Sequence, residues 1–180
     1  MLEIIVPSCE LWDEEKEEYI YMPEQVLQLE HSLVSLSKWE SKWCKPFLYQ
    51  KEKSYEETVD YIKCMTLNKN INSFVYYSLT MDNFDEINKY INAPMTATTF
   101  SDDKNSKPNR EIITSEIIYY WMIALGIPFE CQKWHLNKLL TLIRVCNIKN
   151  QPPKKMGKRE LMSRNAALNA ARKKLMNTRG

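Results

Sequence analysis

The residues best suited to metal binding or nucleophilic catalysis are two histidines and five cysteines, and they are scattered along the chain. Cys131 and His135 lie four residues apart in a segment with helical periodicity, so they would share one helix face. A zinc site needs further ligands at comparable spacing, and only His31 and isolated cysteines remain. We therefore predict a buried thiol beside a partly buried imidazole, with no metal and no cofactor.

Other patterns typical of catalysis are missing from the sequence. The paired carboxylates Glu56-Glu57 and Asp102-Asp103 are explained by a helix N-terminus and by a solvated loop. With 3 glycines in 180 residues, the sequence contains neither a dinucleotide-binding fingerprint nor a phosphate-binding P-loop. We expect a protein that binds other macromolecules and is not an enzyme.

Composition and cysteine usage indicate the compartment. The chain is 44% hydrophobic and 27% charged, as in ordinary globular proteins. Its odd number of cysteines, none in C-x-x-C spacing, favours free thiols in a reducing environment. The N-terminal residues do not resemble a signal peptide, and the most apolar stretch, Ile117–Leu125, is too short to cross a bilayer. These features predict a cytoplasmic protein without a membrane anchor.

A small antiparallel β element is predicted at the N-terminus, either a hairpin or a three-stranded meander. Residues 2–6, 19–22 and 26–30 are rich in β-prone or alternating apolar side chains. The acidic run at residues 13–18 separates the first two of these segments and reads as a solvated turn.

From Ser32 onward the sequence is mainly helical. A first helix follows Ser32 and ends before Pro46, and Ser54 with Glu57 forms a capping box for a second. Two shorter helices are expected near residues 71–78 and 82–91, and a polar loop at 101–110 precedes the next helical segment.

Two further helices are expected after this loop. The first starts near Glu111 or Ser115 and is apolar nearly all round, which is typical of a core centre or an oligomer interface. It ends at Gly126, and Pro128 follows. The second, at residues 131–146, would place Trp134, Leu139, Leu142, Ile143 and Cys146 on one face and pack antiparallel to the first.

Pro152 and Pro153 mark a boundary between a helical body, 1–150, and a basic tail, 151–180. The tail holds nine basic residues and one acidic residue, giving +8, whereas the body holds 16 basic and 22 acidic residues, giving −6. Residues 158–176 are strong helix formers, and leucines recur every seven residues at 161, 168 and 175. The predicted class is mainly α, with a small N-terminal antiparallel β element and a basic helical tail.

Candidate partner-binding residues lie in this tail and in the first helix. The tail cations are Lys154, Lys155, Lys158, Arg159, Arg164, Arg172, Lys173, Lys174 and Arg179. They could form a solvated terminus, contact phosphates, or dock onto an acidic helical protein. A lack of aromatic residues in the tail disfavours stacking on single-stranded nucleic acid. Trp39 and Trp43, one helical turn apart, suit either core packing or an aromatic anchor for a partner.

Three segments give the chain a family resemblance. They are LEHSLVSLSKWE at 29–40, EIIYYWM at 116–122 and RNAALNAARKK at 164–174. In these segments and their order, the sequence resembles tail assembly chaperones of long-tailed bacteriophages.

That resemblance implies a mainly helical protein of the host cell cytoplasm that takes part in virion morphogenesis but is absent from the finished particle. Such chaperones bind the tape measure protein, a long helical chain, and keep it soluble until tail tube subunits polymerise around it. It also allows contact with the tail tube protein and self-association. Two alternatives stay open. One is a structural head–tail connector or tail completion protein, and the other is a nucleic-acid-binding regulator that uses the basic tail.

Overall fold

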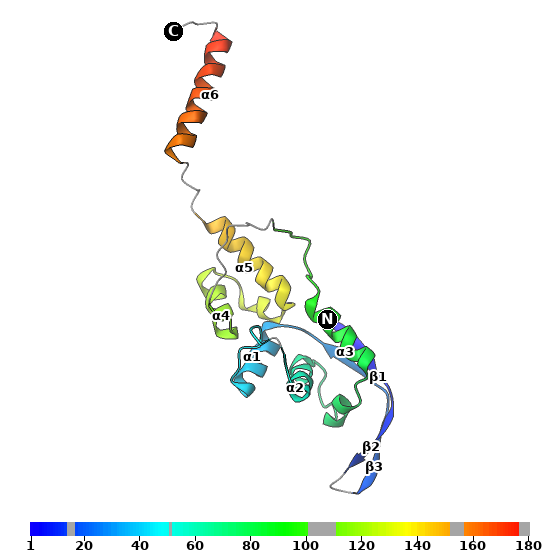
Figure 1. Cartoon of the computed structure of the whole chain (residues 1–180). Coiled ribbons are helices and arrows are strands. Elements are labelled where there is room, and N and C mark those ends of the chain that lie inside the picture. The colour runs from blue at the N-terminus through cyan, green and yellow to red at the C-terminus, as the bar shows by residue number, and fades with distance from the viewer. Residues whose placement is uncertain (14–16, 51, 101–110, 152–156, 177–180) are drawn as a thin grey trace. The chain divides into compact units, whose positions relative to one another are not determined.

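The computed structural model describes residues 1–13, 17–50, 52–100, 111–151 and 157–176. It is mainly α, as predicted, with a small antiparallel β element near the N-terminus (Figure 1). The elements in chain order are β1 Leu2–Val6, β2 Cys9–Asp13, β3 Glu18–Met22, β4 Gln25–Leu29, α1 Leu33–Trp43, α2 Tyr55–Met65, the 3₁₀ helix η1 Ser73–Tyr77, α3 Met81–Asn92, α4 Ser115–Ala124, the 3₁₀ helix η2 Phe129–Lys133, α5 Leu136–Asn150 and α6 Lys158–Met176.

The four strands form one interrupted hairpin. β1 pairs with β4 and β2 pairs with β3, both antiparallel. The two ladders share a single register, because Leu2 lies opposite Leu29 and Cys9 lies opposite Met22. The hairpin alternative of the sequence analysis is therefore observed, and the three-stranded meander is not.

Proline explains the interruption. Pro7 and Pro23 lie in the gap between the two ladders, and a proline has no backbone N–H to donate to a neighbouring strand. Strand β2 was not predicted. Its residues carry acidic side chains and merge with the acidic run, which masks the strand pattern. The middle of that run, residues 14–16, lies outside the described residues.

One face of this interrupted hairpin, which we call the ribbon (β1 to β4), belongs to the core. Ile4 and Leu27 are fully buried, whereas their neighbours Ile5 and Val26 are exposed on the opposite face. Such alternation follows from the two-residue period of a strand. Helix α3 packs on β1, and the Asn83 side chain donates to the carbonyl of Ile5 at 3.1 Å.

Helices α1 and α2 form the centre of the helical layer, and the sequence defines where both begin. Ser32 caps α1 together with Ser35, and Ser54 caps α2 in the predicted box with Glu57. These side chains satisfy backbone N–H groups that a first helical turn leaves unpaired. The inner faces of both helices are buried against one another.

A buried carboxylate links α1 to two more distant segments. Oε1 of Glu40 accepts the N–H of Phe47 at 2.9 Å, and Oε2 accepts the N–H of Ser115 at 2.7 Å. Ser115 is the first residue of α4, where free N–H groups and the helix dipole favour a negative charge. Glu40 thereby joins α1 to the start of α4, and α4 packs mainly on α1.

Two of the predicted helices differ from the structure. The helix expected at 71–78 is the short 3₁₀ stretch η1. The helix expected at 131–146 is divided into η2 and α5, with Trp134 in an extended conformation between them. The backbone N–H of Leu136 donates to the carbonyl of His31 at 2.7 Å, and an isolated bridge pairs Ser32 with His135. This long-range pairing holds the chain extended where local periodicity favours a helix.

The structure also differs from two contacts that the sequence analysis predicted. Cys131 and His135 do not share a helix face, because they lie on either side of the break. Helix α4 makes its more extensive contacts with α1, whereas the sequence analysis paired it with the next helix. The end of α4 was predicted correctly: Gly126 follows it with a positive φ of 64°.

Two compact units make up the chain, residues 1–147 and 148–180. The core of the first unit combines the ribbon with the helices. Its fully buried large side chains are Ile4, Leu27, Leu29, Leu33, Leu36, Trp39, Ile62, Met65, Ile118, Met122, Leu136 and Leu139. The second unit contains α6, whose bounds match the predicted helix at 158–176.

Candidate functional site

Helix α6 carries most of the predicted partner-binding cations. Six of them lie in it, namely Lys158, Arg159, Arg164, Arg172, Lys173 and Lys174. The alanines and leucines between these cations are strong helix formers. The three cations at 172–174, near the C-terminal end of the helix, interact favourably with the helix dipole. The remaining predicted cations, Lys154, Lys155 and Arg179, lie outside the described residues.

The leucines of α6 form a stripe with two of these cations. Leu161, Arg164, Leu168, Arg172 and Leu175 succeed one another at intervals of three and four residues, so they follow one line along the helix surface. All three leucines are exposed. We call these five residues the α6 stripe. It combines apolar side chains with positive charge on one face.

The two predicted tryptophans lie between α1 and α2. Trp39 is completely buried and its indole N–H donates to the carbonyl of Glu57 at 2.9 Å. Trp43 stacks on Trp39 with ring centroids 6.1 Å apart, and its N–H donates to Asp60 at 2.9 Å. The structure thus places Trp39 in the core, the packing alternative, whereas Trp43 keeps a partly exposed ring.

Helix α4 is apolar on both sides, but the described structure covers only one. Ile118 and Met122 are buried, whereas Tyr120 and Ile123 on the opposite face are 66% and 64% exposed. Glu116, one turn before Tyr120, is also exposed. We call Glu116, Tyr120 and Ile123 the α4 outer face. The sequence predicts that this helix lies in the core or in an oligomer interface, and the structure shows one buried face and one exposed face.

Exposed aromatic side chains also gather at the far end of the ribbon. Trp12 on β2 and Tyr19 on β3 face one another, with ring centroids 5.0 Å apart and ring planes at 65°. Trp12, Tyr19 and the nearby Tyr21 are 50%, 71% and 64% exposed. Such amphipathic aromatic groups are common in binding surfaces.

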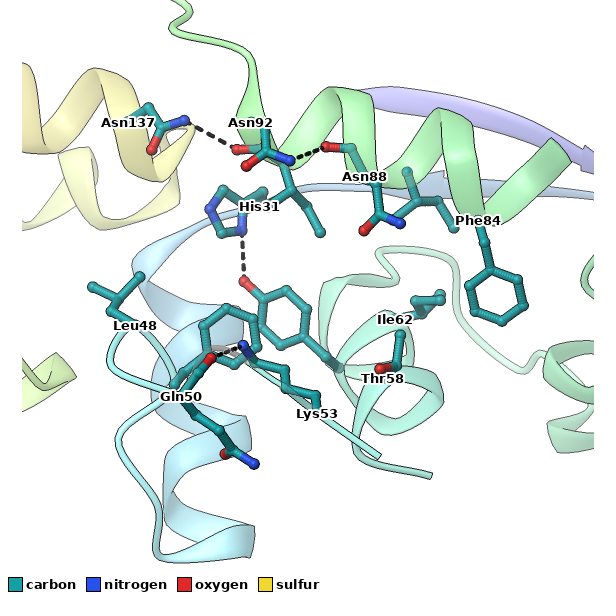
Figure 2. A pocket seen from close by; sticks show the side chains of 14 residues that line it. His31, Leu48, Gln50, Lys53, Thr58, Ile62, Phe84, Asn88, Asn92 and Asn137 are labelled. Atoms are coloured by element: carbon teal, nitrogen blue, oxygen red, sulfur yellow. Dashed lines mark hydrogen bonds between the residues drawn. The ribbon is translucent and has the colours of Figure 1, made fainter. Parts of the chain in front are cut away.

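A hollow of about 490 Å³ lies beside α2 and α3 (Figure 2). Its size is that of a small-ligand pocket or of a groove that receives a few side chains. Apolar side chains from the two helices form part of its lining, among them Ile62, Phe84 and Ile87. The carboxamides of Asn88, Asn92 and Asn137, the Thr58 hydroxyl and the Lys53 ammonium supply polar groups.

A pair of buried histidines lies beside this hollow, and His31 is the one that lines it. His31 contacts the hydroxyl of Tyr61 through Nδ1 at 2.6 Å, as Figure 2 shows. Burial raises the pKa of Tyr61, so its hydroxyl stays protonated in this contact. Burial and the neighbouring His135 lower the pKa of His31 to about 3. The His31 imidazole is therefore neutral, and it is a structural part of the wall.

His135 is also held in place by hydrogen bonds at both ring nitrogens. Its Nε2 donates to the carbonyl of Tyr90 at 3.1 Å, and its Nδ1 accepts the N–H of Asn137 at 3.3 Å. Burial lowers the pKa of His135 as well. Sequence analysis missed this pairing because the two histidines are far apart in the chain and no local pattern connects them.

Lys53 is the cation of the hollow. Its Nζ lies 4.0 Å from the centroid of the Phe47 ring and donates to the carbonyl of Gln50 at 3.0 Å. Burial lowers the pKa of this ammonium group. Among the described residues, the lining of the hollow therefore presents one positive group and several neutral amides. Such a lining suits a ligand that carries both polar and apolar groups.

Within the described ranges, no group of three or more histidine, cysteine or acidic side chains could hold a metal ion. Cys131 and His135 are both buried, but Cys131 lies in η2, whereas His135 precedes α5 in an isolated bridge. Among the helices that the structure describes, none combines the length and apolar character needed to cross a membrane.

Comparison of the chain with models of known protein families, with curated proteins and with solved structures gave no match.

Proposed function

We propose that this chain is a tail assembly chaperone of a long-tailed bacteriophage. In this proposal it binds the tape measure protein in the host cytoplasm and keeps it soluble until the tail tube polymerises. The chain has no catalytic role and needs no cofactor. The single observation that carries the proposal is the α6 stripe, in which three exposed leucines alternate with two arginines on one helix face.

Such a stripe fits an amphipathic helical client. A long helical protein without its partners exposes apolar stripes that aggregate unless they are covered. The leucines of α6 would cover such a stripe, as in coiled coils and helix-in-groove complexes. Arg164, Arg172 and the other tail cations would attract acidic side chains of the client and speed its capture.

The first unit would contribute further contacts. Trp43 has a partly exposed ring beside Lys42 and Lys45, whereas Trp39 is enclosed and would act only by holding α1 to α2. The exposed aromatic side chains Trp12 and Tyr19 at the end of the ribbon offer a second contact. Several weak contacts on one chain raise the overall affinity for a long client.

Affinity purification from phage-infected cells tests the proposal. The tagged chain is recovered after nuclease treatment and a moderate-salt wash, and co-purifying proteins are identified by mass spectrometry. We expect the tape measure protein as the dominant partner. Recovery of nucleic acid before nuclease treatment, and of no partner after it, would instead support a regulator that binds phosphates through the basic tail.

A second measurement separates a chaperone from a structural protein. Purified particles are probed for the chain by mass spectrometry. A chaperone is absent from them, whereas a connector or tail completion subunit is present at a fixed copy number.

A further inference from the structure

The hollow beside α2 and α3 is not used by the proposed function, and its lining separates into an apolar and a polar part. Ile62 on α2 and Phe84 and Ile87 on α3 belong to the apolar part. Ile62 and Ile87 are 1% and 2% exposed, so the surrounding core fixes their side chains. An apolar wall that is already in place binds an apolar group without the cost of ordering its own side chains.

Among the described residues that line the hollow, Lys53 carries the only charge. Its Nζ donates to the carbonyl of Gln50 at 3.0 Å and lies over the Phe47 ring. No described residue forms an ion pair with it, since the nearby Glu57 accepts instead from Lys45 at 2.6 Å and from the Gln50 carboxamide at 3.0 Å. An ammonium group has three donors. The partly buried Lys53 can therefore still donate to an anion that enters the hollow.

The Asn88 carboxamide adds an uncharged donor and acceptor. Figure 2 shows it pointing from α3 toward Thr58 and Ile62 of α2. Within the described part of the chain no hydrogen bond joins this carboxamide to another residue, whereas the Thr58 hydroxyl donates to the carbonyl of Ser54 at 2.9 Å. The Asn88 side chain is therefore available to a polar group of a ligand.

We propose that this hollow binds a small monocarboxylate with an apolar body. Its carboxylate accepts from Nζ of Lys53, and its apolar body packs against Ile62, Phe84 and Ile87. A volume of about 490 Å³ is within the range of small-ligand pockets. One ammonium group balances one negative charge, whereas a dianion such as a phosphate monoester would keep a second charge without a partner in a partly buried site.

The ligand site and the α6 stripe are built from different residues. None of the described residues that line the hollow belongs to α6. Loss of ligand binding should therefore leave client capture unchanged, and the two proposals can fail independently of one another.

Nuclear magnetic resonance titration of the purified full chain tests the site with two matched probes, 4-phenylbutyrate and its neutral amide, 4-phenylbutanamide. We expect saturable shifts of the backbone amide signals of residues 58–62 and 84–88 with both probes. The carboxylate should bind about tenfold more tightly than the amide, because a hydrogen bond to a charged group is stronger than one between neutral groups. Equal affinity for the two probes, or no saturable shift with millimolar carboxylate, would overturn the proposal.

The charge of Lys53 is tested by a variant that keeps an apolar stem. Lys53→Met should weaken the binding of 4-phenylbutyrate about tenfold and leave the binding of the amide unchanged, so that the two probes bind this variant equally. Lys89→Met, at an exposed position of α3 outside the lining, causes the same change in net charge and should bind both probes as the native chain does. Equal losses in the two variants would mean a diffuse attraction and no site at Lys53.

The position of the ligand is tested by filling the hollow. Asn88→Trp introduces a large side chain from an exposed position of α3 and should abolish the binding of both probes. Binding that survives this change would place the probes elsewhere on the chain and contradict the proposal. Circular dichroism verifies that each variant is folded.

Discussion

The imidazoles of His31 and His135 lie edge to face inside the first unit, with ring centroids 5.0 Å apart and ring planes at 67°. The two residues are separated by more than a hundred positions in the sequence, yet the bridge between Ser32 and His135 and the bond from Leu136 to the carbonyl of His31 bring them together. Both histidines are buried and hydrogen-bonded in their neutral form.

Because of this pair, we expect the protein to lose stability at a higher pH than the titration of carboxylates alone would cause. The pKa of His31 is about 3 in the folded chain, against 6.5 for an unperturbed histidine. Between these values the unfolded chain binds a proton that the folded chain excludes. The free energy of unfolding should therefore fall as the pH is lowered, by up to about 1.4 kcal/mol per pH unit for His31. The lowered pKa of His135 acts in the same direction.

Urea unfolding between pH 6.5 and 5 measures this slope before most carboxylates titrate. His31→Asn keeps a polar partner for the Tyr61 hydroxyl but cannot bind a proton, so the fall in unfolding free energy with pH should be smaller. An unfolding free energy of the native chain that stays constant over this range would contradict the pairing.

The buried carboxylate of Glu40 predicts a large loss of stability on substitution. Glu40→Ala leaves the N–H groups of Phe47 and Ser115 without their acceptors and should lower the free energy of unfolding by about 3 kcal/mol. Glu40→Gln keeps one acceptor and should cost less. Chemical denaturation of both variants, with Glu86→Ala at an exposed position in the middle of α3 as a control, checks the order.

The two tryptophans should differ in their effect on stability. Trp39→Phe removes a fully buried indole and its hydrogen bond to the carbonyl of Glu57, which should cost about 3 kcal/mol. Trp43→Phe removes a partly exposed indole and its bond to Asp60, which should cost about 1 kcal/mol. Thermal and urea unfolding give both values, and a larger loss for Trp43 would show that the assignment of the core between α1 and α2 is incorrect.

Local patterns predicted much of this fold. The capping box of Ser54 and Glu57, the stop at Gly126 and the bounds of α6 depend on residues a few positions apart, so the sequence alone reveals them. The division between η2 and α5 depends instead on pairing with the segment at His31, and the role of Glu40 depends on an N–H group 75 positions away. Periodicity carries no information about such contacts.

The candidate surfaces show the same distinction. The cations and leucines of α6 were visible in the sequence because charge and spacing are local properties. The exposure of Tyr120 and Ile123 was not, since an apolar helix may be buried on all sides or on one. The hollow beside Lys53 and Asn88 joins residues from several elements, and sequence analysis did not find it.

The α6 stripe predicts how client binding responds to charge. Arg164→Gln with Arg172→Gln removes two cations from the stripe, and Arg159→Gln with Lys173→Gln removes two from the opposite side of the same helix. The first pair should weaken client binding more than the second, although both variants have the same net charge. Titration calorimetry at two salt concentrations measures the difference, and equal losses would indicate a diffuse electrostatic attraction.

Co-expression of this chain with the tape measure protein of the same phage is the most direct measurement, with the soluble fraction of the tape measure protein as the readout. We expect the native chain to keep the tape measure protein soluble. Replacing Leu161, Leu168 and Leu175 by glutamine should abolish this effect, whereas the matched replacement of Ser163, Ala166 and Ala170 on the opposite side should preserve it. Equal solubility with and without the chain, or with both triple variants, would contradict a chaperone that acts through the α6 stripe.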